Sequence, residues 1–337
     1  EFGIAGEGER AFPLLAEAVA AGGSLDDIPN LCCLRNDRFR RSGIEYLPSI
    51  GRPYRSLSES SSYFDLGGMG NVQTKRGCPF GCSYCTYPEI EGRALRLREP
   101  GEVADEIEEL VIGHRARHLF FVDDIFNFPE EHAACLCEEL IRRELSVEWT
   151  CFATPLGMTA DVAALMKQAG CSGVEFGSDA AAEKTLQGLH KPFGVDDIAH
   201  AAEACRSVGL PNAHYIILGG PGEDAGTIHE TCSLFEQVHP TAVIALPGVR
   251  IYPGTDLCDT AVRDGVISVG SSLLEPVFYL SPGIRADEMM CQIGEYAKSR
   301  PNWIVPALDI RCDAAMMSLL RKMGKTGPLW NMLQGAR

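Results

Sequence analysis

The sequence has 337 residues, of which 45% are hydrophobic and 23% are charged, an ordinary composition for a globular protein with a large apolar core. Thirty Lys and Arg residues against 46 Asp and Glu residues give a net charge of −16, and a field of that sign repels the phosphates of nucleic acids. Apolar runs end well short of the roughly 18 residues that a membrane-spanning helix needs. We therefore expect a protein without a membrane span that does not act on nucleic acids.

The cysteine content indicates a reducing environment. Fourteen cysteines in a chain of this length argue against a secreted disulfide framework, which is typical of much smaller domains. We expect a cytoplasmic protein. Most of these cysteines lie among Ala, Leu, Val and Phe, where a free thiol packs as a small hydrophobic side chain.

The N-terminal part, residues 1–65, differs from the rest. It predicts a strand leading into GEGE, a helix over about residues 8–21, and then a Ser-, Arg- and Pro-rich stretch without a clear period. We interpret it as the tail of another domain followed by a linker. Its adjacent thiols, Cys32 and Cys33, are a type of pair that can bind a soft metal or metalloid, although a strand would direct them to opposite faces.

Residues 66–255 predict alternating strands and helices. The strands are expected at 71–76, 118–123, 147–153, 172–178, 213–219 and 241–248, and the helices at 99–114, 129–145, 159–170, 196–209 and 225–238. This order favours an α/β fold with parallel strands, right-handed crossovers and helices on at least one face. Six units predict an open doubly wound sheet or a partial barrel, with the site at the carboxyl ends of the strands. Residues 256–337 predict a mostly helical extension, with helices over 286–299 and 314–324.

The stretch KRGCPFGCSYCTYPEIEGR, residues 75–93, follows the first predicted strand and contains Cys78, Cys82 and Cys85. Zinc is one interpretation, but structural zinc usually has four ligands and only Cys82 and Cys85 have the spacing of a ligand pair. Electron-transfer [4Fe-4S] clusters have four thiolate ligands. Three thiolates on a cubane would leave one iron open to a substrate or cofactor.

This C-x3-C-x2-C loop, with Tyr84 just before the third cysteine, resembles the radical S-adenosylmethionine (SAM) superfamily over roughly residues 70–255. The resemblance implies a (β/α)6 partial barrel and a [4Fe-4S] cluster on Cys78, Cys82 and Cys85, whose open iron chelates SAM. It also implies reductive cleavage of SAM to a 5′-deoxyadenosyl radical that acts on a small-molecule substrate. The electron would come from a donor such as a flavodoxin or ferredoxin.

The resemblance further implies which loops hold SAM. Residues 121–127 would receive its amino group, residues 174–180 its ribose or carboxylate, and residues 216–223 its adenine. Each loop also has a purely structural interpretation, as a carboxylate that accepts from backbone amides, a helix cap or a tight turn. The implied cofactor-binding residues are Tyr84, Asp123, Asp124, Glu175, Ser178, Gly220 and Glu223.

Residues 1–36 resemble the end of the cobalamin-binding domain that precedes the radical domain in one branch of this superfamily. That branch performs methylations, ring closures and rearrangements, so cobalamin is an implied cofactor. Only the last portion of such a domain is present, and none of the eight histidines lies in a D-x-H-x-x-G motif. We therefore expect either a fragment or a member that has lost cobalamin.

Two further observations bear on these interpretations. The methylthiotransferases carry a second cluster, but Cys258, Cys291 and Cys312 are too scattered to predict one here. The alternative function is a non-catalytic iron-sulfur or zinc-binding protein with a structural or sensing role. Such a protein would not need Asp123, Glu175 and Gly220 to converge on an open iron.

Overall fold

The computed structural model describes residues 1–35, 38–55, 63–64, 68–306 and 327–332. The chain divides into two compact units. The smaller unit consists of residues 1–51, 75–80 and 86–98, and the larger one of the described residues within 52–74, 81–85 and 99–337. Within the described ranges, no helix is both long and apolar enough to span a membrane.

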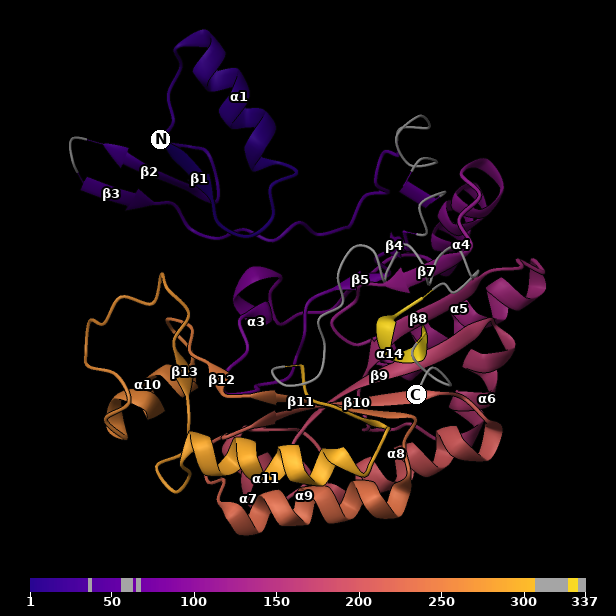
Figure 1. The fold of residues 1–337 in the computed structure, drawn as a ribbon. Coiled ribbons are helices and arrows are strands. Elements are labelled where there is room, and N and C mark those ends of the chain that lie inside the picture. Colours follow the sequence, from indigo (N-terminus) through magenta and orange to yellow (C-terminus); the bar gives the residue numbers. More distant parts are fainter. Residues whose placement is uncertain (36–37, 56–62, 65–67, 307–326, 333–337) are drawn as a thin grey trace. The chain divides into compact units, whose positions relative to one another are not determined.

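The larger unit is built on a parallel sheet of seven strands (Figure 1). The six predicted strands are confirmed, and a seventh, β14, joins them by pairing with β11. Because the described sheet is open, two of these strands form its edges. Across the sheet the order is β14 (Trp303–Ile304), β11 (Ala242–Pro247), β10 (Asn212–Leu218), β9 (Cys171–Asp179), β8 (Glu148–Ala153), β7 (His118–Phe121) and β4 (Gly70–Val72).

The first predicted strand is wrong at its carboxyl end. Its pairing with β7 stops at Val72, which lies opposite Phe121. Residues Lys75–Arg76 form a separate strand, β5, which pairs antiparallel with β6 (Arg96–Leu97) in the smaller unit. The chain therefore leaves the sheet just before the cysteine motif.

Helices on the outside of the sheet confirm the five helices predicted for the core (Figure 1). The first continues through a π-helical turn, Glu109–Gly113. The third begins with a capping residue, since the Thr159 hydroxyl accepts a hydrogen bond from the Val162 backbone N–H at 3.2 Å. The six-residue helix α7 (Glu183–Gly188) was not predicted, because fewer than two turns give no readable period. The others are α4 (Pro100–Glu108), α5 (Glu130–Arg142), α6 (Ala160–Gln168), α8 (Val195–Val208) and α9 (Ala225–Val238).

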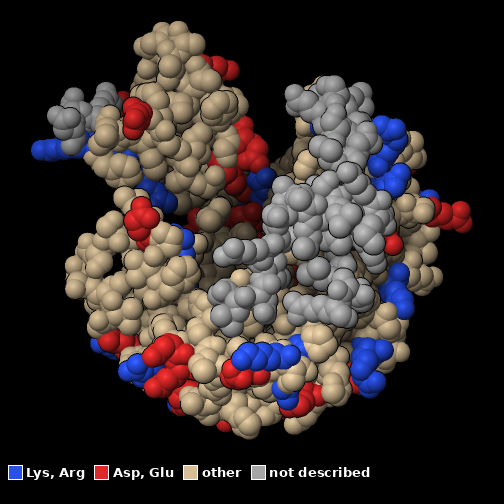
Figure 2. All heavy atoms as spheres, in the orientation of Figure 1, with Lys and Arg blue, Asp and Glu red and all other residues tan. Residues whose placement is uncertain are grey.

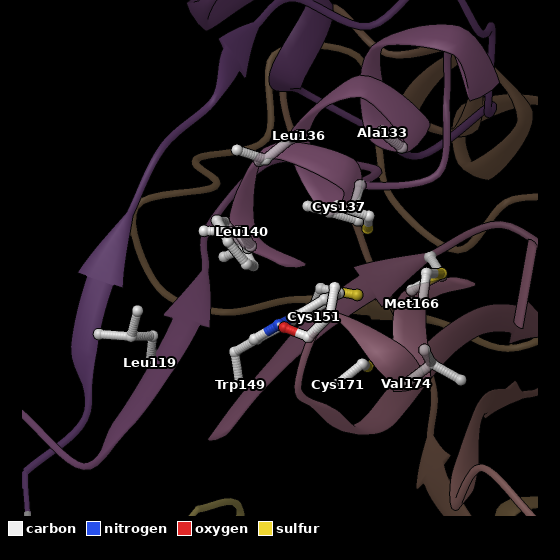
Figure 3. Packing of buried hydrophobic residues seen from close by; sticks show 14 of the residues in the cluster. Leu119, Ala133, Leu136, Cys137, Leu140, Trp149, Cys151, Met166, Cys171 and Val174 are labelled. Carbon is white, nitrogen blue, oxygen red and sulfur yellow. The ribbon is translucent and has the colours of Figure 1, made fainter. Parts of the chain in front are cut away.

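The core lies between this outer face of the sheet and the helices. One cluster packs β7, β8 and β9 against α4, α5, α6 and α8. Its thiols, among them Cys137, Cys151 and Cys171, are buried beside Trp149 (Figure 3). Burial raises the pKa of the Cys151 thiol well above its usual value. These cysteines therefore act as small hydrophobic side chains, as the sequence predicts.

The C-terminal extension contributes to the sheet as well as to the helical layer. It contains α10 (Asp256–Arg263), β13 (Phe278–Tyr279), the predicted helix α11 (Ala286–Lys298) and β14. β13 pairs antiparallel with β12 (Val249–Arg250). The short helix α14 (Leu329–Met332) places Trp330 on the inner face of the sheet, among Ala213, Ala242, Ile244 and Ile304. The helix predicted at 314–324 lies outside the described residues.

The smaller unit contains a three-stranded antiparallel sheet of β1 (Phe2–Ile4), β2 (Leu31–Arg35) and β3 (Arg38–Arg41), with α1 (Ala11–Ala21). Cys32 and Cys33 are consecutive in β2, opposite Gly3 and Phe2 of β1. Their side chains therefore point to opposite faces, an arrangement that does not favour a shared metal.

A buried carboxylate connects the N-terminal segment with the strands that flank the cysteine motif. Glu7 Oε1 lies 3.3 Å from Arg76 Nη1 and 2.6 Å from Arg96 Nη1. Its other oxygen accepts from the Leu47 backbone N–H at 2.6 Å. β5 and β6 of the smaller unit are thus anchored to residues far away in the sequence.

Charged side chains on the helical layer are mixed in sign. Figure 2 shows Lys and Arg interspersed with Asp and Glu along the side formed by α9 and α11. Arg300 lies 2.8 Å from Glu236, and Lys184 lies 2.7 Å from Asp224. The positive charges of these two side chains are therefore offset by neighbouring carboxylates.

Candidate active site

The cysteine motif is a tight loop whose entry requires glycine. Gly77 has φ +93°, and a Cβ there would overlap the carbonyl oxygen of Ala94. The Cys78 backbone N–H donates to the Gly92 carbonyl at 3.1 Å, and Cys85 N–H donates to the Cys82 carbonyl at 3.1 Å. Cys78 is buried, Cys82 and Cys85 are half-buried, and none forms a disulfide. Cys78 belongs to the smaller unit and the other two to the larger one.

The second half of the loop is fastened to the segment after α7. The Ser83 backbone N–H donates to the Leu189 carbonyl at 3.0 Å, and the Ser83 hydroxyl donates to the Gly188 carbonyl at 3.3 Å. The Leu257 N–H donates to the Ser83 carbonyl at 2.8 Å. Residues 82–85 are therefore held by backbone contacts from two distant segments.

Tyr84 connects the loop to the carboxyl end of β9. Its hydroxyl donates to Asp179, and the Lys191 ammonium binds the same carboxylate oxygen at 2.6 Å. Burial, together with the Asp179 charge, raises the pKa of Tyr84 well above its usual value. Burial lowers the pKa of Lys191, but the Asp179 carboxylate, Cys82 and Cys85 together outweigh this effect and the net shift is upward. Tyr84 thus remains a neutral donor and Lys191 a cation.

Asp123 lies at the carboxyl end of β7, as predicted, and is completely buried. Its two oxygens accept from the Thr74 backbone N–H at 2.6 Å and from the Thr74 hydroxyl at 2.5 Å. The carboxylate therefore ties the end of β4 to the end of β7. This contact agrees with the structural interpretation of Asp123, in which the carboxylate accepts from the backbone. The neighbouring Asp124 is half-buried.

Glu175 lies in the middle of β9, on the inner face of the sheet. Its carboxylate accepts from Trp330 Nε1 at 3.0 Å. Burial raises the pKa of Glu175, while Trp330 and Tyr215 oppose the rise. Ser178 faces the helices instead, where its hydroxyl lies 2.8 Å from His214 Nδ1.

Gly220 and Glu223 form a closed turn after β10. Glu223 Oε2 accepts from the Gly220 N–H at 3.0 Å and from the Gly219 N–H. Burial raises the pKa of Glu223 to about 7, although the two amide hydrogen bonds oppose that shift. Gly220 packs on Thr185 and Leu189, so the turn adjoins the segment that also holds the cysteine loop.

The structure thus places Asp123 just after β7 and the Gly220–Glu223 turn just after β10, and it joins Tyr84 to the carboxyl end of β9. Ser178 is the penultimate residue of β9 but faces the helices, and Glu175 lies in the middle of that strand. The sequence did not indicate two further residues near the motif. Asp179 ends β9 with a left-handed backbone, φ +63°, and Lys191 follows α7. Asp179 lies within the predicted segment 174–180, but the sequence did not indicate its pairing with a lysine twelve positions away.

Comparison with known proteins identifies the middle of the chain. Residues 72–235 match the family model of the radical SAM superfamily. This segment is a radical SAM domain. The predicted membership is confirmed, and the match begins at the last residue of β4 and includes all three motif cysteines.

Curated relatives of the radical SAM domain include methyltransferases and a cyclase. An uncharacterized methyltransferase of Pyrococcus horikoshii is 26% identical over 272 residues, covering 78% of this chain and 58% of the relative. Tryptophan 2-C-methyltransferase of Streptomyces laurentii is 25% identical over 242 residues, 67% of this chain and 40% of the relative. Anaerobic magnesium-protoporphyrin IX monomethyl ester cyclase of Rubrivivax gelatinosus is 30% identical over 167 residues, 49% of this chain and 30% of the relative. The chain therefore matches between 30% and 58% of the length of these relatives.

A solved structure with the same fold is that of the radical SAM methyltransferase TsrM from Kitasatospora setae, with cobalamin and a [4Fe-4S] cluster bound. It superposes with a TM-score of 0.85 at 22% identity and covers 99% of this chain and 75% of that one. The cobalamin-dependent radical SAM enzyme OxsB gives a TM-score of 0.62 at 16% identity, over 77% of this chain and 39% of that one. These likenesses confirm the predicted partial-barrel fold.

The motif of the radical SAM domain suits a cluster rather than a single ion. Within the described ranges, no three His, Cys, Asp or Glu side chains are gathered for one metal ion. A cubane distributes its thiolates over separate irons, so its ligands need not meet at one point. Burial raises the pKa of Cys82, and the adjoining Lys191 opposes this rise. Three cysteines outside any disulfide, one of them beside a buried cation, match the donors that iron-sulfur clusters use.

Proposed function

We propose that this chain belongs to a radical SAM enzyme that uses cobalamin to methylate a small-molecule substrate. The observation that carries the proposal is the attachment of the cysteine loop, through Tyr84 and Asp179, to the carboxyl end of β9. In parallel α/β sheets that end of the strands is where ligands bind. A protein that used the cluster only for structure would have no need to fix it there.

Cys78, Cys82 and Cys85 would hold the [4Fe-4S] cluster. When bound, the cluster supplies an electron to SAM, and the resulting cleavage yields methionine and a 5′-deoxyadenosyl radical. The roles of this chain's own residues are to hold and orient the cofactors. Tyr84 fixes the loop, and the backbone of the turn from Gly220 to Glu223, kept closed by the carboxylate, would border the adenine.

The remaining predicted SAM contacts have different structural surroundings. Asp123 and Asp124 would receive a cationic amino group just after β7, where Asp123 accepts two hydrogen bonds from Thr74. Glu175 and Ser178 would need other partners than Trp330 and His214 to reach the ribose or carboxylate. We therefore rank Asp123 and Asp124 ahead of Glu175 and Ser178 as SAM-binding residues.

Cobalamin is proposed because methyltransferases recur among the relatives and because TsrM and OxsB were solved with cobalamin bound. Cobalamin supplies a cobalt centre that carries a methyl group. Residues 1–36, which supply the β1-α1-β2 segment of the smaller unit, resemble in sequence the end of a cobalamin-binding domain. Ring formation, as in the cyclase relative, is the second reaction type that the relatives suggest.

We further propose that a flavodoxin or ferredoxin reduces the cluster and that the protein is cytoplasmic. None of the thirteen described cysteines forms a disulfide, which is the state that a reducing compartment maintains. The rival interpretation, a non-catalytic iron-sulfur or zinc-binding protein, predicts metal binding without turnover of SAM.

The test is anaerobic reconstitution of the chain with iron and sulfide, followed by reduction and addition of SAM with and without cobalamin. We expect about four irons per chain and formation of 5′-deoxyadenosine or, by methyl transfer, S-adenosylhomocysteine. The triple Cys78, Cys82, Cys85→Ala variant should lose both. Cys135→Ala, at an exposed cysteine of α5, is the matched control and should retain both. Four irons without either SAM product would favour the non-catalytic rival.

A further inference from the structure

A buried ion pair of the larger unit adjoins residues 82–85 of the cysteine motif without supplying a cluster ligand. Lys191 Nζ and Asp179 Oδ2 are 2.6 Å apart, and the exposed fractions of the two side chains are 7% and 5%. Burying two charges costs free energy that their mutual attraction often fails to recover. A buried pair of this kind is therefore weak evidence for stability alone, and its position indicates a different role.

The surroundings of Lys191 show where its charge acts. The ammonium lies 6.0 Å from the ring centre of Tyr84 and 5.1 Å from that of Phe193. Burial raises the pKa of the Cys82 thiol, and the Lys191 charge opposes this rise. The cation is thus enclosed between a carboxylate, two aromatic rings and one cysteine of the motif.

Hydrogen bonds hold both Lys191 and residues 82–85 to the turn after α7. Lys191 closes the turn after α7 through its backbone N–H, which donates to the Leu186 carbonyl at 3.0 Å. Leu189 and Gly188 of the same turn accept from the backbone and hydroxyl of Ser83. The distance between the lysine and residues 82–85 is therefore fixed by direct hydrogen bonds.

We propose that the Lys191–Asp179 pair sets the reduction potential of the iron-sulfur cluster held by the motif. This inference rests on the proposed function, because it requires the cluster. Reduction adds one electron from an external donor, needs no proton, and makes the cluster one unit more negative. Lys191 stabilises the reduced form, Asp179 opposes it, and Tyr84 holds the carboxylate in place. Reduction potentials of such clusters depend on nearby charge and on hydrogen bonds to the sulfurs.

The decisive feature is that the two charges act in opposite directions. Lys191→Gln removes the positive charge and keeps a side chain of similar length. Asp179→Asn removes the negative charge and keeps the shape, and Asn tolerates the left-handed backbone of this position. Lys191→Arg keeps the charge and serves as the conservative control. A merely structural role would make both neutral variants loosen the loop in the same way.

The experiment is an anaerobic potentiometric titration of the reconstituted chain with dithionite, followed by electron paramagnetic resonance of the reduced cluster. At a fixed potential near the wild-type midpoint, Lys191→Gln should lower the ratio of reduced to oxidised cluster about tenfold, a shift of about 59 mV. Asp179→Asn should raise the ratio by a similar factor. Lys191→Arg should stay within about twofold of the wild type. Iron and sulfide contents should be equal in all four proteins.

The outcomes separate this inference from the proposed function. A wild-type chain that takes up no cluster would refute both. A wild-type chain that binds the cluster and cleaves SAM, with neutral variants whose ratios shift in the same direction or by less than twofold, would refute the inference alone. If Lys191→Gln retains no cluster, Asp179→Asn decides the question, because only a raised ratio supports the charge effect.

Discussion

Asp123 can be either a structural link or a cofactor-binding residue, and stability measurements distinguish the two roles. Its carboxylate joins the end of β7 to Thr74 after β4, through the backbone N–H at 2.6 Å and the hydroxyl at 2.5 Å. Asp123→Asn keeps the shape and one acceptor for the backbone N–H. The substitution removes the negative charge and places an amide group where the hydroxyl donates.

The expected magnitude follows from these two contacts. A hydrogen bond to a charged group contributes about 1.5–3 kcal/mol, and the side chain is completely buried, so little solvent screening reduces that value. Asp123→Asn should therefore lower the free energy of unfolding of the larger unit by about 1.5–3 kcal/mol. Thr74→Val removes only the hydroxyl contact and should cost about 1–3 kcal/mol.

Urea unfolding of the chain without cofactors, followed by tryptophan fluorescence, measures these losses. The three tryptophans, Trp149, Trp303 and Trp330, all belong to the larger unit, so the signal reports that unit alone. In the double variant the two losses should be non-additive by at least about 0.5 kcal/mol, as expected for residues in direct contact. A loss below about 0.5 kcal/mol for Asp123→Asn, or full additivity, would refute the structural link and leave cofactor binding as the role of Asp123.

Three further predictions concern other parts of the larger unit and the entry of the motif. Burial raises the pKa of Glu223 to about 7, above the roughly 4.3 of an unfolded glutamate. Between these values the unfolded chain binds fewer protons, so the free energy of unfolding should fall as pH rises from about 4.5 to 7, by at most about 3 kcal/mol. Glu223→Gln should remove this part of the slope between pH 5 and 8 in urea titrations, and an unchanged slope would contradict the assignment. Trp330→Phe removes the N–H that donates to buried Glu175 and should lower the free energy of unfolding by about 1–3 kcal/mol, as measured by circular dichroism. A loss under about 0.5 kcal/mol would show that the contact is dispensable. Gly77→Ala should lower the iron content of the reconstituted chain several-fold, because φ is +93° and a Cβ at Gly77 would meet a carbonyl oxygen. Gly81→Ala is the control and should be tolerated, because the space at its Cβ is open. Equal iron contents in the two variants would disprove the steric argument.

The spacing of the cysteines and the period of the hydrophobic residues were sufficient to predict the cluster motif and the order of the main strands and helices. Three cysteines in eight positions indicated a cluster with an open iron, and alternating strand and helix patterns predicted six parallel strands. Both signals are local, because ligand spacing and hydrophobic period are properties of neighbouring residues. Short elements were missed, as α7 and the two-residue β14 show, because they contain too few residues to display a period.

The sequence by itself determined the type of chemistry, and the tertiary structure decided which polar side chains lie near it. Glu175 and Ser178 are three positions apart in one strand and point to opposite faces, so a segment that looked like a single ligand loop became two different environments. The pairing of Asp179 with Lys191, and of Glu175 with Trp330 across 155 positions, depends on where the chain returns after its turns. Side-chain direction and long-range contact follow from packing, which no local pattern of residues specifies.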